Sequence, residues 1–132
     1  MLIPHVTLLF VGILAVIQIP LTVIVGLRRS QTGIQFFDGG DQILLRRMRA
    51  HANFTETVPI TLLSMAGAEM TGAANWTLWA GGSSLLVGRV VHAAIILAKG
   101  SGPLRAVGML LTLAPMLGFG LWVALHALRG AA

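Results

Sequence analysis

The sequence predicts an all-α integral membrane protein, a four-transmembrane-helix up-down bundle that forms a single domain over 1–132. Composition is the first reason. Hydrophobic residues make up 56% of the 132 residues, charged residues only 10%, and the mean hydropathy is +0.88, far from the values of soluble domains. The second reason is that the apolar residues fall into long runs separated by short polar breaks, so lipid is the expected solvent for most of the chain.

The first predicted helix covers 2–27. This run holds no charged residue apart from the titratable His5, and it stops at Arg28 and Arg29. Its length is enough to span the hydrocarbon core with some tilt. It is too long for the apolar core of a signal peptide and has no small-residue cleavage pattern, so we expect a retained helix.

Three further helices follow, over 42–70, 76–98 and 104–128. The segment 30–41 is polar and glycine-rich around Phe36 and Phe37, which is typical of a loop at the membrane interface. Thr71, Gly72 and Asn75 mark the second break, and 99–103 marks the third. Short breaks favour an up-and-down order of antiparallel neighbours.

Basic residues predict the orientation of the bundle. They flank the first and third loops, which places these loops in the cytoplasm and both termini outside it. Trp76, Trp79 and Trp122 then fall toward the opposite interface, where indoles are favoured. The basic residues of the two loops are Arg28, Arg29, Arg46, Arg47, Lys99 and Arg105.

The net charge of +5 does not indicate nucleic-acid binding, because the basic residues form no stripe with interleaved aromatic residues. They match instead loops that face anionic membrane lipid. The absence of cysteine excludes disulfides, thiolate nucleophiles of the chain itself and iron–sulfur ligation by cysteine. Any thiol chemistry must therefore come from a ligand.

Ionisable residues occur inside two of the predicted helices. Arg46, Arg49, Asn53 and Glu56 share one helical face, and Glu56 lies roughly 15 Å along the helix from Arg46. Arg89 lies ten residues before Lys99 and therefore at a matching depth from the same interface. Intramembrane charges generally have partners, so we predict an ion pair between Glu56 and Arg89.

Two histidines raise haem binding as an alternative to a polar ligand site. His92 lies one turn from Arg89, and His51 lies between Arg49 and Asn53, so the pair resembles axial ligands of haem. A single histidine on each helix is more often a hydrogen-bonded core residue, and a Soret band would decide the question. Arg105, at the start of the fourth helix, either reaches between helices or faces lipid headgroups.

Together the polar residues offer several cations, one amide and one carboxylate. This set suits a small peptide-like polyanion with an amine, whose carboxylates would meet arginine forks and whose ammonium would meet Glu56. A thiol on that ligand becomes a better nucleophile if Arg105 stabilises its thiolate. The set comprises Arg28 or Arg29, Arg49, Asn53, Glu56, Arg89, His92 and Arg105.

The motifs RAHANFTETVP, GRVVHA and PLRAVG, with Pro115 inside the last helix, resemble the MAPEG family, the membrane-associated proteins in eicosanoid and glutathione metabolism. The resemblance covers essentially the whole chain and is closest to bacterial-type members. It implies a homotrimer in the bacterial inner membrane, with glutathione as cosubstrate bound between subunits in the cytoplasmic half. The second substrate would be a lipophilic small molecule.

The resemblance also implies roles for individual residues. Arg105 matches the catalytic arginine near the glutathione thiol. The matches to glutathione-binding positions are Arg49, Asn53, Glu56, Arg89, His92 and Arg29, the last with Arg28 as the alternative. Family enzymes place tyrosines around glutathione, whereas this chain has none and carries Ile96 and Met109 there. Ala106 stands where some prostaglandin-forming members have a serine, which leaves activation by arginine alone.

The leading hypothesis is a glutathione-dependent membrane transferase or peroxidase that acts on a lipophilic electrophile through an arginine-stabilised thiolate. The alternative is a non-catalytic structural or accessory subunit of a larger membrane complex, which the loss of every tyrosine favours. A small multidrug exporter is the third reading. It is the weakest, because the first helix has no acid and the membrane carboxylate lies beside arginines in the second.

Overall fold

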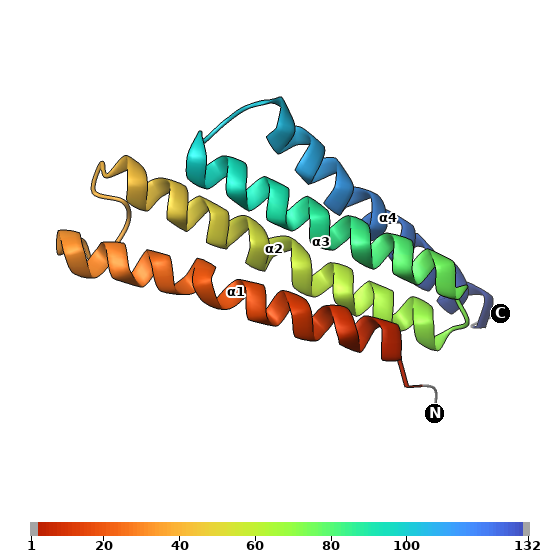
Figure 1. Ribbon diagram of the computed structural model, residues 1–132. Helices are drawn as coiled ribbons and strands as arrows, with labels where there is room; N and C mark the ends of the chain where they lie inside the picture. The colour runs from red at the N-terminus through yellow and green to blue at the C-terminus, as the bar shows by residue number, and fades with distance from the viewer. Residues whose placement is uncertain (1–2, 131–132) are drawn as a thin grey trace.

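The computed structural model describes residues 3–130 and consists of four long helices in an up-down bundle (Figure 1). Helix α1 begins and helix α4 ends at the same end of the bundle, near the α2–α3 turn, and the α1–α2 and α3–α4 connections lie at the opposite end (Figure 1). We call the end with the α1–α2 and α3–α4 connections the basic end, and the end with the α2–α3 turn the terminal end. The predicted fold class is confirmed. The helices are α1 His5–Thr32, α2 Gln42–Met70, α3 Asn75–Ala98 and α4 Pro103–Gly130.

Helix α1 continues past the predicted end at residue 27 and includes both arginines. It ends at Gly33, whose backbone is left-handed with φ 73° and whose N–H donates to the carbonyl of Arg29 at 2.9 Å. The apolar run marks where the hydrocarbon ends, but arginine is a good helix former, so the helix itself stops only at the glycine. The predicted start at residue 2 lies outside the described residues.

The α1–α2 connection is fixed by Asp41. Its carboxylate caps α2 by accepting from the N–H of Leu44 at 2.7 Å, and it forms an ion pair with Arg28 at 2.6 Å. The hydrogen bond from Arg28 is the main reason that the pKa of Asp41 lies below its ordinary value. One carboxylate therefore joins the end of α1 to the start of α2.

The terminal end is held together by Glu69 and Trp122. The Glu69 carboxylate accepts from the N–H groups of Val6 and Thr7, at 2.9 and 2.8 Å, and from the Thr7 hydroxyl at 2.7 Å. These N–H groups are among those that a helix start leaves without partners. Trp122 Nε1 donates to the hydroxyl of Thr71 at 3.0 Å, which joins α4 to the α2–α3 turn.

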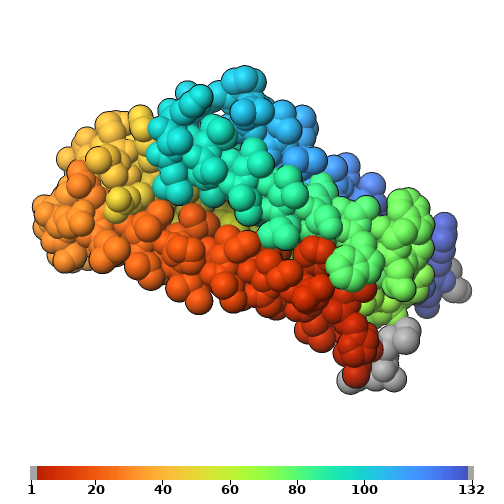
Figure 2. Space-filling model, in the orientation of Figure 1, coloured from red at the N-terminus to blue at the C-terminus, as the bar shows by residue number. Residues whose placement is uncertain are grey.

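Helices α2 and α3 each contact all the other helices, whereas α1 and α4 flank them and do not touch each other. Figure 2 shows α1 running along one side of the molecule. Gly82 on α3 lets the ring of Phe10 approach closely, and this ring also meets Trp79 edge-on at a centroid separation of 5.7 Å. Large core side chains include Phe10, Leu14, Phe54, Met65, Leu78, Leu85, Ile96 and Phe119.

The helices α1, α3 and α4 are each long and apolar enough to cross a membrane. Helix α2 is as long but more polar, because its first half carries Arg46, Arg47, Arg49, His51 and Glu56. It runs antiparallel to α1 and α3 and contacts all three of the other helices (Figure 1). The protein is thus a multi-pass membrane protein with one polar helix inside the bundle.

Candidate functional site at the basic end

Arg89 is the most deeply placed charge of the bundle, with only 2% of its surface exposed. Its Nε donates to Thr112 Oγ1 on α4 at 2.7 Å. Its Nη1 donates to the carbonyl of Asn53 at 3.1 Å and to Thr57 Oγ1 at 3.2 Å, both on α2. One guanidinium therefore connects three helices through neutral oxygen acceptors.

The predicted ion pair between Glu56 and Arg89 is wrong for this chain. The carboxylate of Glu56 lies on the exposed face of α2, and the only ion pair among residues 3–130 joins Arg28 and Asp41. Matching depth fixes the height of a residue in the membrane but not its direction around the helix. Thr57 faces Arg89, and Glu56, one residue earlier, is turned away by about 100°.

The Nη2 atom of Arg89 faces the first half of α4. Nη2 lies 3.4 Å from the carbonyl of Gly108 and 3.6 Å from Sδ of Met109. His92, one turn further along α3, is 3% exposed. Helices α3 and α4 come close enough for these contacts because both carry glycine at the crossing. A Cβ on Gly108 would lie 2.9 Å from the carbonyl oxygen of Gly88 and 2.9 Å from the backbone nitrogen of His92.

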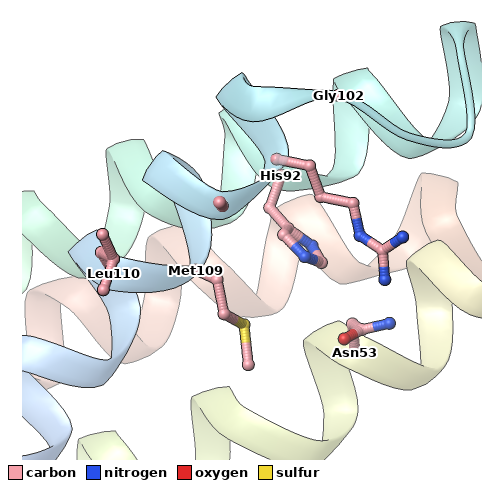
Figure 3. Close-up of a pocket in the computed structure, with 7 residues that line it drawn as sticks. Asn53, His92, Gly102, Met109 and Leu110 are labelled. Carbon is pink, nitrogen blue, oxygen red and sulfur yellow. The ribbon is translucent and has the colours of Figure 1, made fainter.

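A cavity of about 520 Å³ opens between α2, α3 and the first turns of α4. Asn53, His92 and Met109 point toward a common space from these three helices (Figure 3). The Asn53 side chain is held in place by its Nδ2, which donates to the carbonyl of Arg49 at 2.8 Å. The lining residues are Asn53, His92, Gly102, Arg105, Ala106, Met109 and Leu110.

Arg105 lies in the first turn of α4 and is half-buried. Its Nη1 donates to the carbonyl of Gly100 at 3.3 Å, so the guanidinium folds back toward the α3–α4 connection. Of the two readings left open by the sequence, the structure therefore places Arg105 at the cavity between helices. Its remaining N–H groups are available to an anion in that cavity.

A second, smaller cavity of about 250 Å³ lies on the other side of Arg105, and we call it the basic pocket. Its cationic lining residues come from α2, the α3–α4 connection and α4. Arg49, one of the predicted binding residues, is exposed here rather than in the larger cavity. The residues that line the basic pocket are Gln42, Leu45, Arg46, Arg49, Ile96, Lys99, Gly100, Ser101 and Arg105.

Comparison of the sequence with known proteins identifies the family. The sequence model of the MAPEG family matches residues 7–125, which is most of the chain. The chain belongs to the MAPEG family.

Two relatives are similar over part of this range. They are the inner membrane proteins YecN of Escherichia coli strain K12 and of Escherichia coli O6:H1 strain CFT073, each 38% identical over 64 residues. The matched segment is 48% of this chain and 49% of each relative, so the match spans about half the length of the curated relatives. Their names state a membrane location and no activity.

The structure brings some of the predicted MAPEG site residues together and leaves others apart. Asn53, His92 and Arg105 line one cavity. Arg89 does not line it but contacts Met109, which does, with Nη2 at 3.6 Å from Sδ. Glu56 lines neither this cavity nor the basic pocket. Arg105 is the one arginine among the lining residues of this cavity in the described part of the chain, so the cavity brings together fewer of the predicted charged residues than the sequence suggests.

Arg29 is placed differently from the expectation. Its Nη1 donates to the carbonyls of Ile34, Gln35 and Phe37 at 3.1, 2.8 and 3.2 Å, and its Nη2 lies 3.4 Å from Sδ of Met48. This guanidinium therefore holds the α1–α2 loop of its own chain. The alternative, Arg28, is engaged by Asp41.

Thr57, Thr112 and Gly88 are the site residues that the sequence reading missed. The two hydroxyls accept hydrogen bonds from Arg89, yet threonine in a membrane helix more often only donates to a carbonyl one turn earlier. Both of these threonines also make that bond, at 2.8 Å to Asn53 and 3.0 Å to Gly108. The available signal was their spacing: Thr57 lies four residues after Asn53, on the face that meets α3.

Proposed function

We propose that this chain is a glutathione-dependent membrane transferase or peroxidase that presents the thiolate of glutathione to a lipophilic electrophile. The observation that carries the proposal is the cavity in which Asn53, His92 and Arg105 meet the apolar side chains of Met109 and Leu110. Polar donors on one side and apolar groups on the other suit a water-soluble thiol and a partner dissolved in lipid. Membership of the MAPEG family supports a glutathione-related role.

Arg105 is the residue that we assign to catalysis. A guanidinium keeps its charge at every physiological pH, and a fixed positive charge next to a thiol favours the reactive thiolate. Ala106 beside it provides no hydroxyl, so the arginine would act without a second donor from that position. The apolar lining strengthens the attraction because it excludes water.

The bond changes differ between the two activities. In conjugation, the thiolate sulfur forms a bond to an electrophilic carbon, and the leaving group departs with its electron pair. In peroxide reduction, the thiolate takes the terminal oxygen of a hydroperoxide and the alkoxide that leaves is protonated to an alcohol. A second glutathione then converts the sulfenic acid to a disulfide with release of water.

The remaining predicted residues would bind the rest of glutathione. Arg49, Asn53 and His92 would bind its carboxylates and amides, and the buried charge of Arg89 would add to the attraction. Glu56 would bind its ammonium group. Arg29 would contribute only if its guanidinium exchanged the loop carbonyls for a glutathione carboxylate, as in a site shared between neighbouring copies.

A homotrimer belongs to this proposal. Arg49, Glu56, Ile60 and Leu63 lie on one exposed face of α2, and two of them are charged. An exposed carboxylate facing hydrocarbon is costly, so another copy of the chain is the occupant that we expect on this face. The composition of α2, which is more polar than that of the other three helices, supports the same arrangement.

Binding of glutathione to the detergent-purified protein is the deciding experiment. Calorimetry is combined with the ultraviolet difference signal of a thiolate. We expect binding with a thiolate signal, and Arg105→Ala is expected to abolish the signal while the oligomer persists in size-exclusion chromatography. Arg129→Ala removes a cation at the terminal end and is the matched control. An unchanged signal in Arg105→Ala contradicts the assignment.

A non-catalytic accessory subunit is the second candidate. The observation that favours it is the absence of tyrosine from the chain, and Ile96, which the resemblance matches to a family tyrosine, is 2% exposed. No binding at millimolar glutathione, together with co-purification of a stable larger complex, would select this candidate.

We also propose that the protein lies in a bacterial inner membrane with both termini outside the cytoplasm. The cations at the basic end support this orientation, and the inner-membrane relatives support the location. Fusion of alkaline phosphatase to the C-terminus should give an active periplasmic enzyme, whereas a fluorescent protein that matures only in the cytoplasm should stay dark.

A further inference from the structure

The basic pocket contains four cations and no acid among its lining residues. These cations are Arg46, Arg49, Lys99 and Arg105. Placed in one cavity of about 250 Å³, they repel one another unless an anion is present.

The carboxylates of the chain lie elsewhere. Asp38 and Asp41 belong to the α1–α2 connection, where Asp41 is paired with Arg28. Glu69 caps α1 at the terminal end, and Glu56 faces outward from α2. Because the sequence has only four acidic residues, no acid of the same chain is left to balance the basic pocket.

Two of the guanidiniums are held in place by the α3–α4 connection. Arg46 Nη1 donates to the carbonyl of Ala98 at 3.4 Å, and Arg105 Nη1 donates to that of Gly100 at 3.3 Å. Gly100 has a φ of 77°, and a Cβ there would lie 3.3 Å from Arg46 Nε, so the glycine permits this approach. Each guanidinium has five N–H donors, and one of them is used in each case.

We propose that the basic pocket binds a phosphate group, carried by the headgroup of an anionic lipid or by a small soluble phosphate ester. Guanidinium forks match the oxygens of a tetrahedral phosphate, and Lys99 adds a point charge at the rim. The pocket lies where the apolar helix α3 ends and α4 begins, and in the proposed orientation this end of the bundle would face the headgroups of the cytoplasmic leaflet. The pocket shares Arg49 and Arg105 with the proposed glutathione set, so the test rests on Arg46 and Lys99, which belong to the pocket alone.

Arg46 and Lys99 make the two ideas separable, because neither belongs to the proposed glutathione set. The test uses delipidated protein in a neutral detergent. Native mass spectrometry counts bound phosphatidylglycerol, with phosphatidylcholine as the zwitterionic comparison, and calorimetry measures inorganic phosphate. The variants are Arg46→Gln, Lys99→Gln and the double variant. Arg47→Gln, which changes a neighbouring cation outside the pocket, and Arg129→Gln, at the terminal end, are the controls.

Each single variant should weaken phosphatidylglycerol binding about 5-fold, and the double variant about 25-fold, since a cation near anionic lipid contributes on this scale. Glutathione binding should persist in the single variants and in the double variant. Binding of the lipid without inorganic phosphate identifies a headgroup site, and inorganic phosphate that competes with the lipid identifies a site for the phosphate group alone. Unchanged binding in the double variant, or an equal loss in Arg47→Gln, overturns the proposal.

Discussion

Arg89 on α3 and Thr112 on α4 are joined by a hydrogen bond of 2.7 Å between Nε and Oγ1, inside the bundle and beneath the candidate cavity. The same hydroxyl donates to the carbonyl of Gly108 at 3.0 Å. Thr112 thus links the buried charge to the backbone of α4. This bond is the shortest of those that Arg89 makes.

Replacing Thr112 with valine should destabilise the protein by about 1–3 kcal/mol, because a buried charged donor loses its best acceptor. The matched control is Thr112→Ser, which keeps the hydroxyl and should retain most of the stability. The measurement is the free energy of unfolding in mixed micelles titrated with a denaturing detergent. Equal stability of the valine and serine variants would show that the hydroxyl contributes nothing.

Gly108→Ala should separate α3 from α4 at the basic end. The added methyl would meet the backbone of Gly88 and His92, neither of which is a flexible side-chain end. We expect lower thermal stability, and at least a 10-fold weaker affinity for glutathione at the proposed site, because His92 on α3 and Arg105 on α4 would no longer line one cavity. Gly118→Ala on the same helix meets nothing within 4 Å and serves as the control. That variant should be neutral or slightly stabilising, since alanine favours helix over glycine.

The ion pair of Arg28 and Asp41 predicts a pH dependence at acid pH. The pKa of Asp41 is lowered from the ordinary value of 3.8, chiefly by the hydrogen bond from Arg28. A group with a lowered pKa stabilises the folded state fully above its ordinary value, and this contribution is lost as pH falls below 3.8 and through the folded-state pKa. Unfolding midpoints measured from pH 6 to about pH 2 should show this loss in the natural chain.

Asp41→Asn is the control for this pH dependence. Asparagine still caps a helix, so α2 should begin at the same residue, but it does not titrate. The part of the acid-induced loss due to Asp41 should therefore be absent in the variant. An acid profile identical to that of the natural chain would mean that the ion pair does not affect stability.

Glu69→Gln should loosen the start of α1. The carboxylate accepts three hydrogen bonds, whereas the amide of glutamine has one oxygen and would turn N–H groups toward other donors. Amide hydrogen exchange at Val6 and Thr7 should become faster, while exchange at the α1–α2 connection should not change. Asp38→Asn, which neutralises a half-buried carboxylate at the other end of the bundle, is the comparison variant.

The sequence predicted the helices well because the apolar runs are long and the breaks contain glycine. It also placed Arg89 and Glu56 at the same height along the bundle, since Arg89 donates to Thr57, the residue that follows Glu56. It did not predict their partners. Direction around a helix depends on packing, and the packing here is decided by glycines at the α3–α4 crossing and by the hydroxyls of Thr57 and Thr112. Spacing puts Thr57 on the same face as Asn53, but it does not show that its hydroxyl accepts from Arg89.

Arg29 illustrates a second limit of the sequence. Its position beside Arg28 at the end of an apolar run suggested a membrane-facing cation or a ligand contact, and either residue was equally acceptable. The three carbonyls that engage Arg29 belong to a loop whose conformation depends on left-handed residues at Gly33, Phe37 and Gly39. Such backbone geometry is not readable from composition, so the role of this arginine emerged only from the folded loop.

The neutral surroundings of Arg89 have a thermodynamic consequence. The buried guanidinium of Arg89 donates only to carbonyl, hydroxyl and thioether acceptors, none of which carries a negative charge. Its charge therefore produces a positive electrostatic potential in the protein interior. An anion that enters the neighbouring cavity need not displace an acid of the chain, and mass action then links its concentration to the stability of the whole bundle. The empty protein should consequently be at its least stable in media of low ionic strength, and anions of unrelated structure should all protect it to a degree set by their charge.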